Sequence, residues 1–186
     1  MRIVAGKFRG AGLAAPKGLA TRPTSDRVRQ ALFNVLEHGA SGLDFDGARV
    51  LDLFAGSGAL GLEALSRGAR FATFIEDSAA ARAAIRRNVE ALGLTGVTKI
   101  WRRDATKLGD AGTLAPFDLI FCDPPYAQGA GEQALASAVN GGWAEKGAVG
   151  VLEERADVVI AWPAPFEEID RRLYGTTQVA MARAVS

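Results

Sequence analysis

Segments with the pattern of short buried strands alternate with segments of helical pattern from about residue 48 onward, and this order constrains the fold more than any other feature. Five apolar runs read as strands: residues 50–54, 71–75, 97–101, 117–122 and 148–152. Helical spacing falls between them, at residues 59–66, 78–92 and 132–140, with a looser helical stretch near residue 106. Strands that alternate with helices build a parallel sheet that is covered by helices on both faces.

The end of the chain departs from this alternation. Residues 158–160, 166–173 and 177–184 read as strands with no long helix between them. Such a run predicts antiparallel pairing at one edge of the sheet. We therefore expect an α/β fold with a doubly wound, mostly parallel sheet.

The first 30 residues are strongly basic. They contain seven Lys or Arg and a single acid, Asp26, whereas the remainder carries 15 bases and 20 acids, so that the net charge is +1. A basic block on an otherwise acidic chain indicates contact with a polyanion. A solvated tail without a partner would carry the same charge, and both interpretations stay open on charge alone.

A helix is expected directly after the basic block. Ser25 supplies a capping hydroxyl, and Asp26 places an acid in the first turn. Apolar residues then recur at helical spacing to about Gly39. We divide the chain into a basic N-terminal extension with a β-hairpin and a helix, residues 1–40, and a main domain, residues 41–186.

Composition and hydropathy indicate the cellular compartment in which we expect the protein. The apolar runs are shorter than the roughly 18 residues of a membrane span, and the start of the chain lacks the pattern of a secretory signal. The single cysteine, Cys122, has no internal partner for a disulfide, which suits a reducing compartment. We expect a cytoplasmic protein.

The glycines of residues 56–61 fit the pattern G-x-G-x-x-G between a strand and a helix. They allow a tight turn and the close approach of a ligand to the backbone. Glu76 ends the next strand, at the spacing of an acid that accepts hydrogen bonds from ribose hydroxyls. A nicotinamide-dependent dehydrogenase therefore competes with other nucleotide-cofactor enzymes at this point.

Asp52 argues against the dehydrogenase. It lies inside the first predicted strand, where its carboxylate would repel a pyrophosphate but would tolerate a cationic sulfonium. Asp104, which comes just after the third predicted strand, is either a cap or a contact to the adenine amine of the cofactor.

The tetrapeptide Asp123-Pro124-Pro125-Tyr126 ends the fourth predicted strand and is the most specific signal in the chain. The two prolines forbid a helical turn and leave a stiff, extended segment. An exocyclic base amine is planar and a poor nucleophile. The Asp123 carboxylate and the Pro124 carbonyl can each accept one of its hydrogens, which favours the pyramidal nitrogen of the transition state. Tyr126 can stack on the extruded base.

Together these motifs resemble the bacterial RsmD family, which methylates the exocyclic N2 amine of a guanine in 16S ribosomal RNA. The resemblance covers essentially the whole chain and is weakest after Gly147. Besides the tetrapeptide it rests on R-I-V-A-G at residues 2–6, R-G at 9–10, R-P-T at 22–24, D-R-V-R at 26–29, L-F-N at 32–34 and F-A-G-S-G-A-L-G-L-E-A-L-S-R at 54–67. The chain departs from the family at Ala11 and Gly12, where basic residues are frequent, and at Gln30, where Glu is usual.

The resemblance implies a class I, Rossmann-like methyltransferase fold with a mostly parallel seven-stranded sheet and an antiparallel edge strand. It implies S-adenosylmethionine as cofactor, held by Asp52, Ala55, Gly56, Ser57, Gly58, Glu76, Asp77, Asp104 and Ala105. It assigns the chemistry to Asp123, Pro124 and Tyr126. It assigns RNA binding to Arg2, Lys7, Arg9, Arg22, Arg27 and Arg29. We expect no metal ligands.

The expected partner is 16S ribosomal RNA or the small ribosomal subunit, and we expect a monomer. Two alternatives remain. The tetrapeptide also suits a DNA adenine-N6 methyltransferase, although the chain leaves no room for a separate DNA-recognition domain. A non-catalytic RNA-binding assembly factor would have no need of Asp123.

Overall fold

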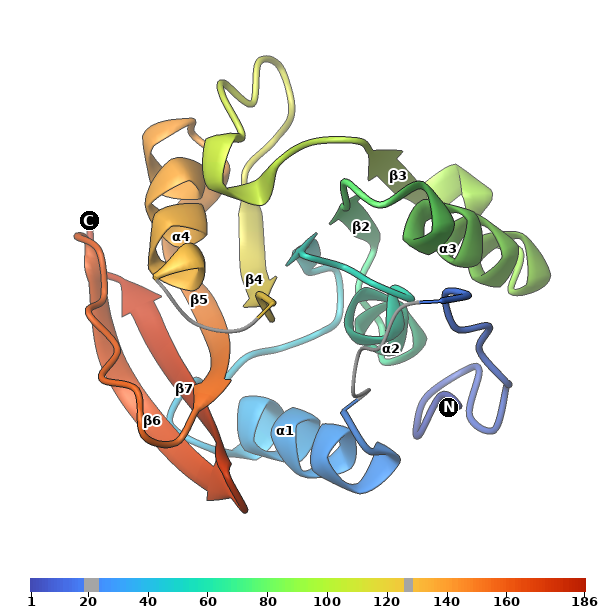
Figure 1. Ribbon diagram of the computed structural model, residues 1–186, viewed down its shortest axis with the longest axis horizontal. Coiled ribbons are helices and arrows are strands. Elements are labelled where there is room, and N and C mark those ends of the chain that lie inside the picture. Colours follow the sequence, from blue (N-terminus) through green and yellow to red (C-terminus); the bar gives the residue numbers. More distant parts are fainter. Residues whose placement is uncertain (19–23, 126–128) are drawn as a thin grey trace.

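A seven-stranded mixed sheet forms the centre of the computed structural model, in which residues 1–18, 24–125 and 129–186 are described (Figure 1). Within these residues the strand order is β3-β2-β1-β4-β5-β7-β6. The strands are β1 Arg49–Leu53, β2 Phe71–Ile75, β3 Thr98–Trp101, β4 Phe117–Cys122, β5 Ala144–Arg155, β6 Phe166–Tyr174 and β7 Thr177–Ala184. The predicted α/β class and the antiparallel pairing at one edge are confirmed, because β7 runs antiparallel to both β5 and β6.

The order of the parallel strands reverses between β1 and β4. Leu53 at the end of β1 pairs with Cys122 at the end of β4, and Cys122 pairs in turn with Leu152 of β5. In open α/β sheets, ligands bind beyond the carboxyl ends of the strands at such a reversal. The glycine loop follows β1 and the Asp-Pro-Pro segment follows β4, so both motifs leave the sheet at this point.

Helices cover both faces of the sheet. They are α1 Asp26–His38, α2 Ala59–Ser66, α3 Ala79–Ala91 and α4 Ala130–Asn140, with 3-10 turns η1 Thr95–Val97 and η2 Ala105–Lys107. One apolar cluster contains buried residues of α1, α2 and α3, and a second contains those of α4 together with Trp143. Ser25 caps α1 as predicted, since its hydroxyl accepts a hydrogen bond from Val28 N. No helix in the described part of the chain is long and apolar enough to span a membrane.

Residues 1–18 form a loop that packs onto the main body. Arg2 and Gly12 make an isolated antiparallel bridge, and Ile3 N donates to Ala11 O at 2.9 Å. This part of the predicted β-hairpin therefore pairs antiparallel but contains no continuous strand. Ile3 and Leu13 belong to the same apolar cluster as α1, α2 and α3, so the leading segment and the sheet share one core.

The strand predicted at residues 158–160 was wrong. β5 already extends to Arg155, and a turn at residues 156–157 ends it. Val159 is 88% exposed, whereas Ile160 is buried. The apolar run fits one side chain into the core, and Pro163 follows too soon for another strand to form.

Candidate active site

At two positions of the loop after β1, the backbone has a conformation that only glycine adopts without strain. Gly56 and Gly58 have φ values of 60° and 79°. Open space lies where a Cβ of Gly56 would be, so that a ligand can reach the backbone there. Phe54 has a φ of 55°, which is rare for a bulky residue and places local strain directly before the loop.

Glu76, which follows β2, holds the glycine loop. Its Oε2 accepts a hydrogen bond from Gly56 N at 2.8 Å, and its Oε1 accepts one from Ser78 N at 3.0 Å. A phosphate bound by this loop would need the same Gly56 amide. The Glu76 carboxylate therefore disfavours the binding of a pyrophosphate at this loop. Its remaining lone pairs can still accept hydrogen bonds from ligand hydroxyls.

Asp52 connects β1 to the first turn of α2. Its Oδ2 accepts a hydrogen bond from Gly61 N at 3.1 Å, and the side chain is buried. A Cβ on Gly61 would lie 2.5 Å from the ring of Phe74 and 3.3 Å from Asp52 Oδ2, so the third glycine permits the close approach of helix and strand. Burial raises the pKa of Asp52 well above its usual range, and the negative charges of Asp123 and Glu76 raise it further.

Asp104 follows β3 and caps the short turn η2. Its Oδ1 accepts hydrogen bonds from both the backbone nitrogen and the hydroxyl of Thr106, at 2.9 and 2.7 Å. These bonds lower the pKa of Asp104. The capping interpretation is thus correct, and in the described residues no donor engages Oδ2, which leaves that oxygen free for a ligand.

The other predicted cofactor residues line the same end of the sheet. Ala55 N donates to Ile75 O at 3.1 Å, Ala105 is buried, and Asp77 is exposed with its carbonyl bonded to Arg82. Ser57 is buried, and its hydroxyl lies 3.6 Å from the sulfur of Met1 in the leading segment. The structure brings these residues together, and their contact with a cofactor stays a prediction.

Asp123 and Pro124 follow β4, beside the glycine loop. Pro124 packs close to α4, because a Cβ on Gly131 would lie 3.4 Å from its ring. Burial raises the pKa of Asp123 to about 8, with further contributions from the negative charges of Glu153 and Glu154. Tyr126, the third predicted catalytic residue, lies outside the described residues.

Sequence reasoning missed Glu153. It lies in β5 one position beyond Leu152, in line with Asp123 one position beyond Cys122. Its Oε2 accepts a hydrogen bond from the Thr24 hydroxyl at 3.1 Å. No local motif marks Glu153, because only the register of β4 and β5 brings it to the site.

Asn88 of α3 ties the leading segment to the glycine loop. Its amide nitrogen donates to Ser57 O and to Ala14 O, both at 3.0 Å, and its Oδ1 accepts from Ala14 N at 2.7 Å. The side chain is buried. One amide therefore joins the cofactor loop to residues predicted to face RNA.

The prediction of RNA contact for Arg29 was wrong. Arg29 is only 1% exposed, lies 2.8 Å from Asp26 and 3.7 Å from the buried Glu63, and donates to the carbonyl of Arg2. Glu63 also accepts from the backbone nitrogens of Val4 and Ala5, at 2.9 and 3.0 Å. Arg29 thus anchors the leading segment and is not available to a phosphate.

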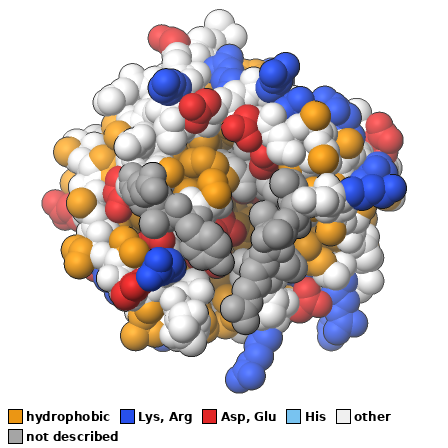
Figure 2. All heavy atoms as spheres, in the orientation of Figure 1, with side chains coloured by type: hydrophobic (Ala, Val, Ile, Leu, Met, Phe, Trp, Pro, Cys, Tyr) orange, Lys and Arg blue, Asp and Glu red, His pale blue; other side chains and the backbone are white. Residues whose placement is uncertain are grey.

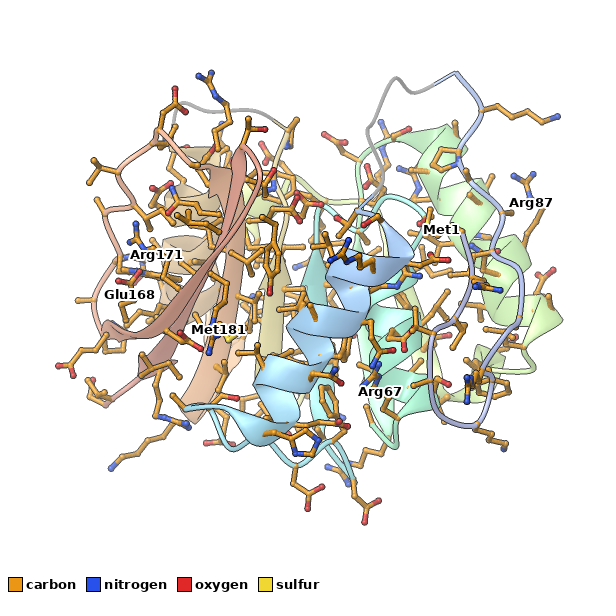
Figure 3. All side chains as sticks on the ribbon, turned by 90° about the horizontal axis from the view of Figure 1, so that it is seen from below. Met1, Arg67, Arg87, Glu168, Arg171 and Met181 are labelled. Carbon is orange, nitrogen blue, oxygen red and sulfur yellow. The ribbon has the colours of Figure 1, made fainter. Side chains whose placement is uncertain are left out.

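Other Lys and Arg side chains around Arg29 are exposed. Of the residues predicted to bind RNA, Arg2, Lys7, Arg9 and Arg27 are exposed, and Arg22 lies outside the described residues. Arg86 and Arg87, which belong to no motif in the sequence, are also exposed, on α3 beside Asn88. Figure 3 shows Arg87 next to the path of the leading segment. Figure 2 shows acidic side chains near the centre of the sheet-end face and Lys and Arg along its rim.

This sheet order, with a glycine loop after β1, acids after β2 and β3 and an Asp-Pro-Pro segment after β4, defines a class I methyltransferase. Solved structures agree. The Escherichia coli protein yhhF superposes with a TM-score of 0.84 at 33% identity, covering 100% of this chain and 98% of its own. The 16S rRNA N2 methyltransferase RsmC of Thermus thermophilus, in complex with AdoMet and guanosine, shares the fold at a TM-score of 0.66 and 22% identity, covering 91% of this chain and 45% of its own.

Sequence relatives identify the family. The model of the family "Conserved hypothetical protein 95" matches residues 1–183. Ribosomal RNA small subunit methyltransferase D of Escherichia coli strain K12 is 39% identical over 143 residues, which are 77% of this chain and 69% of that protein. The chain therefore belongs to the RsmD family of rRNA methyltransferases.

Proposed function

We propose that the protein transfers a methyl group from S-adenosylmethionine to the exocyclic N2 amine of a guanine in 16S ribosomal RNA. The observation that carries this proposal is the position of Asp123 and Pro124 beyond β4, directly beside the glycine loop of β1. A carboxylate and a carbonyl on a rigid turn suit an amine with two hydrogens. Family membership supports ribosomal RNA as the substrate.

The residues around the glycine loop fit a cationic cofactor. The acidic groups of Glu76 and Asp123 lie close enough to Asp52 to raise its pKa, so a cation at this site would be favourable, and the open space at Gly56 admits a ligand to the backbone. Glu76 would hold the ribose, and Asp104 Oδ2 would accept from the adenine amine. When bound, S-adenosylmethionine supplies an electrophilic methyl group on a positively charged sulfur.

Asp123 and Pro124 prepare the amine for reaction. Asp123 must be ionised to accept one amine hydrogen, while the Pro124 carbonyl accepts the other. These bonds strengthen as the nitrogen becomes pyramidal, so they stabilise the transition state more than the ground state. After transfer the nitrogen carries a positive charge and a surplus proton. The raised pKa of Asp123, about 8, makes its carboxylate a better acceptor for that proton than an ordinary aspartate.

The proposed RNA surface is formed by exposed Lys and Arg side chains of the leading segment, α1 and α3: Arg2, Lys7, Arg9, Arg27, Arg86 and Arg87. RNA affinity rests largely on neutralising phosphates. Asn88 and Glu63 fix the leading segment to the main body. The Lys and Arg side chains of that segment therefore keep a set position relative to the site.

The test is methyl transfer to defined substrates. Small ribosomal subunits and naked 16S RNA from cells that lack the protein would be incubated with labelled S-adenosylmethionine, and the product nucleoside and its position determined by mass spectrometry. The expected product is N2-methylguanosine at a single position. Methylation of adenine in DNA alone would establish the alternative enzyme, and RNA binding without any transfer would establish the assembly factor.

A further inference from the structure

We propose that Glu153 reads the N1–H of the target guanine and so selects guanine over adenine. The inference rests on the proposed function and names the group that recognises the base. It concerns the edge of the base next to the reacting amine, a contact that neither the glycine loop nor the Asp-Pro-Pro segment provides.

The sheet register places Glu153 beside the reacting group. β4 and β5 are parallel neighbours, with Phe121 opposite Val151 and Cys122 opposite Leu152. Strands in a sheet lie about 4.8 Å apart. The residues that follow Cys122 and Leu152, Asp123 and Glu153, both carry carboxylates. On guanine the N1–H and the N2 amine are adjacent donors on one edge, so two neighbouring carboxylates match that edge.

A hydrogen bond from Thr24 orients the Glu153 carboxylate. The Thr24 hydroxyl donates to Oε2, and in the described part of the chain no donor engages Oε1. Thr24 is itself adjacent to the cap of α1, and its carbonyl accepts from the buried Arg29 at 3.4 Å. Glu153 therefore has one oxygen fixed and one oxygen available to a base.

The neighbouring acid has a different environment. Glu154 is buried, and its Oε1 accepts from Arg155 N at 2.9 Å. Side chains of successive residues in a strand point to opposite faces, so Glu153 and Glu154 face opposite sides of the sheet. Of the two, Glu153 is the one on the side of the Thr24 hydroxyl.

The chemistry of the base edge explains the selectivity. A carboxylate accepts the N1–H of guanine, whereas the unprotonated N1 of adenine is itself an acceptor and would face it with a lone pair. The close pair of acids is also poorly stable without donors. Burial raises the pKa of both Asp123 and Glu153. A guanine that donates hydrogen bonds from N1–H and the N2 amine would stabilise the ionised form of both carboxylates.

The test compares two bases at one position. Once the methylated guanine has been mapped, 16S RNA carrying guanine or 2-aminopurine there would be built by ligation and offered naked and in reconstituted subunits. 2-Aminopurine keeps the reacting amine but replaces N1–H with an acceptor. We expect the wild type to prefer guanine by at least about tenfold in kcat/KM. We expect Glu153→Gln, whose amide can donate to N1, to reduce that ratio several-fold or invert it.

Matched variants separate recognition from charge and folding. Glu154→Gln also removes a negative charge near Asp123 and should keep the wild-type ratio. Thr24→Val removes the orienting donor and should lower the ratio partly, which gives a second readout if Glu153→Gln folds poorly by circular dichroism. The loss of O6 in 2-aminopurine affects every variant alike and cancels when ratios are compared.

The possible results distinguish failure of the proposed function from failure of the role of Glu153. A wild type that transfers no methyl group to guanine in either substrate refutes the proposed function and the inference with it. A wild type that methylates guanine while Glu153→Gln and Thr24→Val keep its preference refutes the inference alone. An equal fall in the ratio for Glu154→Gln also overturns it, because charge near Asp123 would then be the cause.

Discussion

Asp123 and Glu153 lie side by side, each one residue beyond the paired Cys122 of β4 and Leu152 of β5. Two acids in this position would be unfavourable in a purely structural role, because burial raises the pKa of both and the negative charge of Glu153 raises that of Asp123 further. Asp123 follows β4 at the reversal of strand order, and Glu153 lies on the next strand, so the repulsion between them acts beside the site where the base would bind.

Asp123→Asn should abolish most methyl transfer while cofactor binding stays within a few-fold. The amide keeps the size of the side chain but replaces one acceptor oxygen with a donor that faces the amine. We expect kcat to fall by about 100-fold or more. Single-turnover methyl transfer and calorimetric titration with S-adenosylmethionine would measure the two effects. Unchanged turnover would remove Asp123 from the mechanism.

The pH dependence of kcat/KM should report the ionisation of Asp123. The free enzyme holds this group protonated below its pKa of about 8, and only the ionised form accepts the amine hydrogens. Activity should therefore rise with pH through about 8. Glu153→Gln removes a neighbouring negative charge, so it should shift the midpoint of the profile to lower pH. A midpoint that does not move would contradict this coupling.

Asp123→Asn should stabilise the fold at high pH. The unfolded chain ionises Asp123 near the ordinary pKa of 3.8, and the folded chain ionises it near 8. Between these values the folded state binds more protons, so the free energy of unfolding falls as pH rises. We expect the variant to have a higher Tm than the wild type at pH 9 and a similar Tm near pH 4. A constant difference across this range would show that the charge is not responsible.

Arg86→Glu and Arg87→Glu together should weaken RNA binding and reduce its salt dependence. Each lost phosphate contact lowers the slope of log affinity against log salt by about 0.7–0.9. Lys146→Glu, an exposed site at the opposite end of β5, is the matched control and should leave the slope unchanged. The same slope in all variants would place the RNA elsewhere on the molecule.

Asn88→Ala should loosen the leading segment. It leaves Ala14 N, Ala14 O and Ser57 O without their partner, and each buried unpaired group costs about 1–3 kcal/mol. We expect faster proteolysis within residues 1–18 and weaker cofactor binding. Asn34→Ala on the exposed face of α1, whose amide oxygen accepts one hydrogen bond from Gln30, should change neither.

Most elements could be predicted because their signals are local. β1, β2 and β4 are short, mostly apolar runs, and Ser25 lies where a helix cap is expected. The run at residues 158–160 has the same local composition as a strand, but its pairing depends on where β5 ends. Local pattern carries no information on that point.

The site was predicted where motifs are contiguous and missed where the fold assembles it. Glu153 comes to Asp123 only through the register of two strands. Arg29 was misjudged because net charge does not report burial, although a signal existed. Positions 29, 32, 33 and 36 share one helical face, which places Arg29 among Leu32, Phe33 and Leu36. Its buried partner Glu63 lies on a different helix.

The single core shared by residues 1–18 and the sheet has a consequence for protein engineering. A designer who wished to redirect this enzyme to another RNA could not exchange the leading segment as a cassette. Ile3 and Leu13 would have to be kept as fillers of the main core, together with the backbone that meets Asn88 and Glu63. Retargeting therefore requires substitution of the outward-facing side chains, such as Lys7 and Arg9, while the backbone of the leading segment is kept.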